Sequence, residues 1–167
     1  MFWQKTQVRK SFIEWANGCK VISMTSIGTT TGAQRSDGRY SWCVLSHDMS
    51  VSVAPLYHEG QSCPEQLYYY WSYHVVIQNF GHEAVRLLKR TWIITDGSGH
   101  VETVEGDGVV GEQPWIQPGG MFDYQSACPL RTPTGNMRGW YHFESESGKT
   151  FKARIPLFFL RTNETRH

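Results

Sequence analysis

The feature that most constrains the fold of this chain is a series of short apolar segments separated by turns. In residues 66–80 (QLYYYWSYHVVIQNF), apolar side chains recur at every second position from Leu67 to Ile77, which is the period of a half-buried strand. Aromatic and β-branched residues fill these positions, and both types favour strands. Turn sequences such as DGSG (96–99) separate the segments. The pattern predicts strands over 66–80, 85–95, 100–106, 121–127, 137–144 and 150–160.

This succession of strands predicts an antiparallel β-sandwich, because turn signals return about every 8–12 residues and no helical pattern intervenes. Pro156 lies inside the last apolar run. Proline cannot donate a ladder hydrogen bond, so this strand is expected at a sheet edge or with a bulge.

The N-terminal part of the chain has a different character. Residues 3–17 place Trp3, Phe12 and Trp15 on one side of a predicted helix that ends at Gly18. Residues 25–41 are rich in Gly, Ser and Thr, as loops are. We therefore expect an extension (1–42), a β-sandwich domain (43–162) and a short tail (163–167).

Charge is unevenly distributed between these parts. The formal net charge is +1, but residues 1–42 carry six Lys or Arg and only two acidic residues. This basic, acid-poor composition faintly resembles a mitochondrial transit peptide, so a mitochondrial location is expected, with the cytoplasm as the alternative. No apolar run approaches the roughly 20 residues of a membrane span. The four cysteines show no C-x-x-C pair, so neither a zinc site nor a disulfide framework is expected.

Three glycines have the spacing G-x-G-x-x-G, namely Gly106, Gly108 and Gly111. In dinucleotide-binding proteins this motif joins a strand to a helix whose N-terminus faces the pyrophosphate. Here Pro114 and Pro118 follow, and they forbid that helix. Two interpretations remain. Either the glycines permit sharp bends, with Val109 and Val110 filling the core, or their backbone N–H groups form an anion-binding nest.

A nest between Asp107 and Glu112 would need positive charge nearby. Arg131 and Arg138 bracket the TPTG loop, which in a sandwich could approach the glycines and bind a pyrophosphate with them. Arg86 and Arg90 are expected on one side of their strand. The alternative is that these cations belong to a solvated sheet face.

No catalytic or metal-binding arrangement is evident. The seven histidines lack the spacing of a zinc site, although His74 and His142 could meet across strands. No nucleophile elbow is present. The sequence thus indicates neither a resident metal nor a cofactor, and it favours a protein that is not an enzyme.

The ordered motifs resemble those of the ApaG domain, also called CorD. They are LLKRTWIITDGSG (87–99), EGDGVVG (105–111) and VVGEQPWIQPGGMFDYQSACPLRTPTGNMRGWYHF (109–143), and the similarity extends from about Met49 to Leu160. The resemblance implies an all-β, immunoglobulin- or fibronectin-III-like antiparallel sandwich. It also implies no established catalytic mechanism, and a glycine loop that has been proposed as a pyrophosphate site.

ApaG domains occur as small bacterial proteins linked to diadenosine tetraphosphate breakdown and to cobalt and magnesium sensitivity. They also occur in F-box proteins and in a DNA-polymerase-interacting protein. The segment YYYWSY (68–73) places aromatic rings on both strand faces. This is typical of a surface covered by another protein or by the N-terminal segment. The alternative is that the rings form aromatic cross-strand pairs within this chain.

We therefore expect a non-catalytic interaction subunit or adaptor, in the setting of a mitochondrial nucleic-acid-processing complex. Its interface would include Tyr68 and Tyr70 with the three N-terminal aromatic residues. The alternative is a protein that binds, or weakly hydrolyses, nucleoside polyphosphates through the glycine loop. RNA contact by the basic extension is a third hypothesis, which would make binding salt-dependent.

Overall fold

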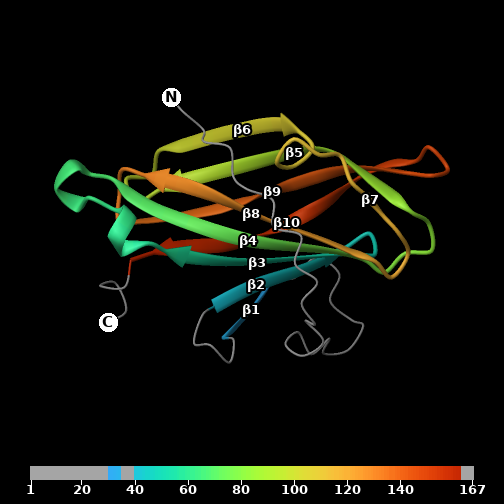
Figure 1. Ribbon diagram of the computed structural model, residues 1–167, viewed down its shortest axis with the longest axis horizontal. Coiled ribbons are helices and arrows are strands. Elements are labelled where there is room, and N and C mark those ends of the chain that lie inside the picture. Colours follow the sequence, from blue (N-terminus) through green and yellow to red (C-terminus); the bar gives the residue numbers. More distant parts are fainter. Residues whose placement is uncertain (1–29, 35–39, 163–167) are drawn as a thin grey trace.

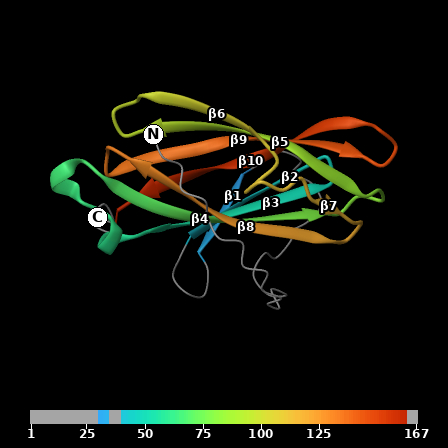
Figure 2. The ribbon, with the colours of Figure 1, turned by 45° about the horizontal axis from the view of Figure 1, so that its top comes forward.

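The computed structural model describes residues 30–34 and 40–162, and it forms a sandwich of two antiparallel sheets (Figures 1 and 2). Sheet 1 contains β1 (Thr31–Gln34), β2 (Tyr40–Ser46), β3 (Met49–Tyr57), β4 (Tyr69–Asn79) and β8 (Met121–Leu130), in that order. Sheet 2 contains β10 (Thr150–Arg161), β9 (Thr134–Ser145), β5 (Val85–Asp96) and β6 (Val101–Asp107).

Three short elements complete the described fold. Strand β7 (Trp115–Ile116) pairs with the start of β5. Two 3-10 turns, η1 (Glu59–Gln61) and η2 (Pro64–Gln66), connect β3 to β4 at one end of the sandwich (Figure 1).

The sandwich expected from the sequence is confirmed, and each of the six predicted strands matches an observed one. Pro156 also behaves as expected, because β10 is an edge strand of sheet 2 and its register shifts between Ile155 and Phe158. The helix expected over 3–17 and the tail 163–167 lie outside the described residues.

Strands β1, β2, β3 and β7 were not among the predicted strands. The boundary expected near residue 42 falls inside β2, and residues 31–34 pair with it, so we place the start of the described sandwich at Thr31. The sequence did not predict β1 because residues 25–41 are rich in Gly, Ser and Thr, as loops are. Only pairing with β2 holds part of that segment as a strand.

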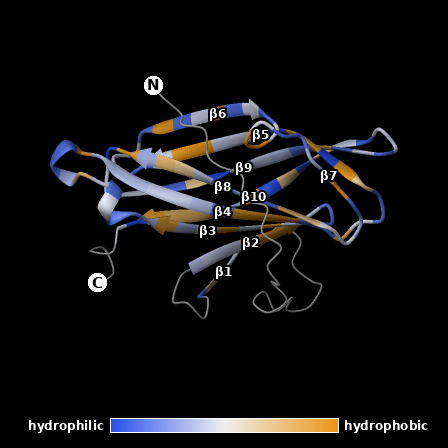
Figure 3. Cartoon of the chain, in the orientation of Figure 1, coloured by the Kyte–Doolittle hydropathy of each residue, from blue (hydrophilic) through white to orange (hydrophobic). Residues whose placement is uncertain are grey.

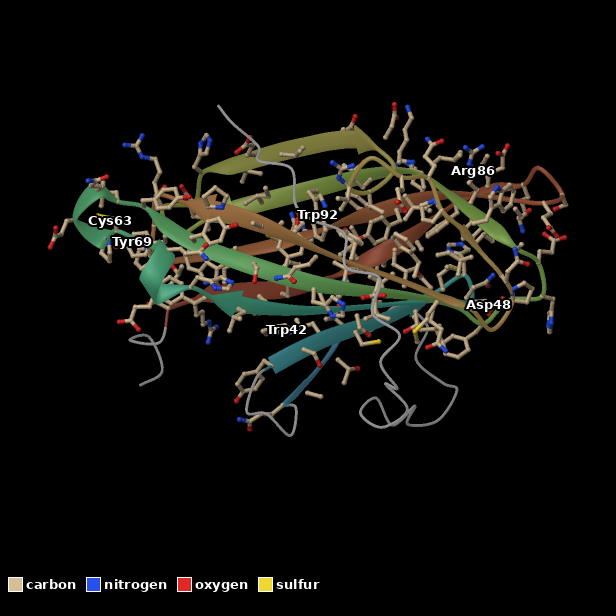
Figure 4. The ribbon with its side chains drawn as sticks, viewed as in Figure 1. Trp42, Asp48, Cys63, Tyr69, Arg86 and Trp92 are labelled. Carbon is tan, nitrogen blue, oxygen red and sulfur yellow. The ribbon has the colours of Figure 1, made fainter. Side chains whose placement is uncertain are left out.

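The core lies between the sheets, where alternate side chains from both layers meet. Figure 3 shows hydrophobic residues along the strands and hydrophilic ones in the β3–β4 connection. Trp92 lies in the middle of the sandwich (Figure 4) and is almost fully buried. Its ring lies edge-on to those of Tyr73, Tyr141 and Phe158, with centroid distances of 5.4, 6.3 and 6.0 Å. This edge-to-face arrangement is favourable for aromatic rings.

A buried hydrogen bond between two tyrosine side chains links the two sheets directly. The hydroxyls of Tyr124 on β8 and Tyr141 on β9 are 2.5 Å apart. Burial raises the pKa of both phenols well above the ordinary value, so both stay neutral. Neither hydroxyl group faces water, and each satisfies the other.

Replacing Tyr141 by Phe should lower the free energy of unfolding by about 1–3 kcal/mol, because Tyr124 would keep a buried hydroxyl without its partner. The double variant Tyr124→Phe, Tyr141→Phe should recover part of that loss. Urea denaturation measures both, with Tyr40→Phe as an exposed control. A double variant no more stable than Tyr141→Phe would contradict the assignment.

Candidate functional site

The glycine loop joins β6 to β7 by a tight turn. Val109 and Glu112 exchange two backbone hydrogen bonds of 2.8 and 2.9 Å. Between them Val110 and Gly111 both have positive φ, 50° and 80°, which is the geometry of a type I′ turn. The N–H of Gly108 donates to the carbonyl of Leu88 at 2.7 Å, which fixes the loop to β5.

Each glycine of the motif has its own structural reason. A Cβ at Gly106 would lie 3.1 Å from both terminal nitrogens of Arg90. A Cβ at Gly108 would overlap the carbonyl oxygen of Glu112. Gly111 has open space around it, and its positive φ alone favours glycine.

The loop also contributes to the core. Val109 is fully buried, and Val110 packs against the core from the rim. The backbone N–H groups of Gly108 and Val109 both donate to carbonyls within the chain, so an anion-binding nest would have to use other donors. Pyrophosphate binding at these glycines stays a prediction.

A β-bulge in β5 decides which arginine lies beside this loop. The register of β5 against β9 shifts between Leu87 and Lys89. The extra residue reverses the alternation, so the expectation that Arg86 and Arg90 share a side is wrong. Arg86 lies on the outer side, opposite Glu144 and Trp115, and towards one end of the sandwich (Figure 4).

Arg90 instead points between the sheets, opposite Tyr141 and Gly106. Its Nη1 donates to the carbonyl oxygens of Asp107 and Gly108, at 3.1 and 2.6 Å. The loop therefore has a cation at its base.

The two arginines that the sequence assigned to the site do not converge on it. The turn holding Arg131 lies beside the β5–β6 turn, where the N–H of Gly97 donates to Thr132 Oγ1 at 2.8 Å. The glycine loop begins six residues away along β5, or about 20 Å, and Figure 1 shows this separation. Arg138 is exposed on the outer side of β9, opposite Ile93. The expected approach of the TPTG loop is thus wrong.

The predicted interface residues lie apart from this loop. Trp3, Phe12 and Trp15 are outside the described residues. Tyr68 and Tyr70 stack with a centroid distance of 6.4 Å at the η1–η2 end of the sandwich. Tyr68 is 42% exposed.

The outer face of sheet 1, on β3, β4 and β8, is almost free of charge. Its charged side chain is Asp123, which accepts a hydrogen bond of 2.8 Å from His74. Register and burial place no Lys or Arg among the outward residues of these three strands, which are Ser50, Ser52, Ala54, Leu56, Tyr70, Ser72, His74, Val76, Gln78, Met121, Asp123, Gln125, Ala127 and Pro129.

The outer face of sheet 2 is different. On β9 and β10 it presents Arg138, Lys152 and Arg154 around Trp140 and Arg161 further along β10, all four cations exposed. The sandwich thus has one nearly uncharged face and one basic face.

The described residues contain no group of three or more His, Cys, Asp or Glu side chains suited to a metal ion. His74 and His142 do not meet, since they lie on the outer faces of different sheets. Of the described cysteines Cys43, Cys63 and Cys128, only Cys128 is buried, and the other two are partly exposed. No helix in residues 30–34 and 40–162 is long and apolar enough to cross a membrane.

Alanine at Gly108 should lower the free energy of unfolding by at least about 2 kcal/mol, because a Cβ there overlaps backbone at positive φ. Alanine at Gly111 should cost only about 1–2 kcal/mol, since strain acts there without overlap. Thermal and urea unfolding of both variants checks the difference. Equal losses would show that the contact with Glu112 does not require glycine.

The comparisons with known proteins agree with this architecture. The family model described as "ApaG domain" matches residues 59–145. Protein ApaG of Sinorhizobium fredii is 49% identical over 116 residues, which are 70% of this chain and 89% of the relative. Protein ApaG of Parvibaculum lavamentivorans is 48% identical over 119 residues, 71% of this chain and 92% of the relative.

A solved structure of the ApaA protein from Bordetella pertussis is similar as well. It superposes with a TM-score of 0.69 at 47% sequence identity, covering 71% of this chain and 96% of that one. With the two-sheet sandwich and the glycine loop in place, the chain belongs to the ApaG domain family.

Proposed function

We propose that this protein is a non-catalytic interaction module, and that the outer face of sheet 1 binds a protein partner. The observation that carries the proposal is the nearly complete lack of charge on that face. Burying an unpaired charge is costly, and interface centres are accordingly depleted in charged residues. The opposite face carries a cluster of arginines and is therefore not depleted in charge.

Aromatic and apolar side chains at the ends of the face support the same function. Tyr68 and Tyr70 stack at one end, where Leu56 is also exposed. Met121 is exposed at the other end. Large side chains of this kind act as anchors in protein interfaces.

The dimensions of the face favour a separate protein over a single helix of this chain. With the neighbouring strand β2 added to β3, β4 and β8, the outer surface of the sheet is about 19 Å wide. One helix with its side chains is about 10–12 Å across, so it would cover only about half of that width. A partner with a flat, uncharged surface fits better. A mitochondrial setting rests only on the composition of residues 1–42 and belongs to the proposal alone.

Substituting Ser52→Arg at the centre of the face should weaken partner binding at least about 30-fold, because a buried unpaired charge costs about 2 kcal/mol or more. Thr103→Arg on β6, which faces the other way, should leave binding unchanged. The tagged full chain is purified from its source, the retained partner identified, and its affinity for each variant measured.

A photo-crosslinking residue at position 54 should join the chain to that same partner. Crosslinks only to a second copy, or only to residues 1–29 of the same chain, would contradict the proposal. So would equal affinity of the Ser52→Arg and Thr103→Arg variants.

A second candidate function is the binding of a nucleoside polyphosphate beside the glycine loop, and the position of Arg90 favours it. Only Nη1 of this guanidinium is committed to the carbonyls of Asp107 and Gly108 in the hydrogen bonds described above. A planar guanidinium suits phosphate oxygens.

Calorimetric titration with diadenosine tetraphosphate and Mg²⁺ tests this candidate. Arg90→Lys should weaken binding about tenfold through loss of the fork geometry. Arg131→Ala should have no effect, because Arg131 lies about 20 Å away. Absence of heat with the unaltered chain would reject it, and a loss with Arg131→Ala would place the ligand elsewhere.

A further inference from the structure

The outer face of sheet 2 combines cations and exposed aromatic rings on two adjacent strands. On β9, Arg138, Trp140 and His142 point outward at alternate positions. On β10, Lys152 lies opposite His142, and Arg154 lies opposite Trp140. We call these five residues the basic face.

Trp140 lies at the centre of the basic face and keeps 36% of its surface exposed. Its neighbours along β9 are about 6.6 Å away on either side, two residues along an extended strand. Phe159, 37% exposed, lies further along β10 with the Arg161 guanidinium 5.0 Å from its ring centroid. Exposed rings flanked by cations form a surface on which a flat, anionic ligand can stack.

The basic face carries a net positive charge. Arg138 and Lys152 form no ion pair with another described residue. The acidic side chains of the same side lie at its margins. Glu144 faces Arg86 towards one end, and Glu105 and Asp107 are on the edge strand β6.

The positive charge of this face also acts on His142. Its pKa lies below the ordinary value, first because it is partly desolvated and then because Lys152 and Lys89 are close, while Glu105 acts in the opposite direction. Its ring nitrogen Nε2 lies 3.2 Å from Thr91 Oγ1, which fixes the ring beside Trp140 on the strand.

We propose that the basic face binds single-stranded RNA, with a base stacked on Trp140 and phosphates held by Arg138 and Lys152. Sheet surfaces that stack bases on aromatic side chains and contact phosphates through flanking cations are a recurrent solution for single strands. The site is independent of the interface proposed on sheet 1, because it lies on the opposite side of the sandwich.

A duplex fits this face less well. The rings lie on an open sheet, and stacking on them requires bases that are unpaired and splayed. An acidic protein would form ion pairs with the cations, but it would leave the exposed indole of Trp140 without a stacking partner. The combination therefore favours a single-stranded nucleic acid over other polyanions.

The test is fluorescence anisotropy of the full chain with a labelled oligouridylate of about 12 nucleotides. Trp140→Ala should lower the affinity about tenfold, whereas Trp140→Phe should retain most of it because a stacking ring remains. Arg138→Ala and Lys152→Ala should each reduce the slope of log affinity against log salt by about 0.7.

Two matched variants serve as controls. Lys149→Ala removes the same charge from the exposed β9–β10 turn, and Phe80→Ala removes an exposed ring outside both outer faces. Neither should change the affinity or the salt slope. Circular dichroism and thermal unfolding establish that every variant is folded.

Three results would overturn the proposal. One is no binding of the oligouridylate at about 50 mM salt. Another is equal binding of inorganic polyphosphate with no effect of Trp140→Ala, which would indicate only a general anion patch. The third is binding to vesicles of anionic phospholipid in place of RNA.

Discussion

The packing of Trp92 between the two sheets is the interaction on which the rest of this structure depends. Its ring contacts Tyr73 from sheet 1 and both Tyr141 and Phe158 from sheet 2. Each sheet has its main apolar surface on its inner side, so neither could be stable in water without the other. Apolar packing does not depend strongly on orientation. The buried hydrogen bond between Tyr124 and Tyr141 does, and it links β8 to β9 in one arrangement.

The bulge in β5 connects that core to the glycine loop. By inserting one residue at Leu88, it turns Arg90 inward and frees the Leu88 carbonyl to accept the N–H of Gly108. Gly106 leaves space for the guanidinium. The three glycines, which have the spacing of a dinucleotide fingerprint, therefore serve here to hold the β6–β7 turn against β5. An anion bound beside them would contact Arg90 and not a helix N-terminus.

The two outer faces divide the surface by chemistry. Sheet 1 presents an almost uncharged face, and sheet 2 presents cations around Trp140. Both arise from the same alternation that builds the core, since every second residue of a strand must point outward. The two proposed partners would therefore occupy opposite sides of the sandwich.

The sequence by itself determined the six long strands from residue 66 onwards, the turns between them, the edge position of Pro156 and the family. Alternation and turn residues are local signals, which can be read from one segment of the sequence at a time. The sequence did not show β1, because pairing with β2 is a contact with another segment. Nor did it show that Arg90, and not Arg131, lies at the glycine loop. It also did not show that cations of the neighbouring strand β10 lie beside Trp140. Those facts depend on a bulge and on strand register, and only the tertiary structure decides which residues of separate strands stand side by side.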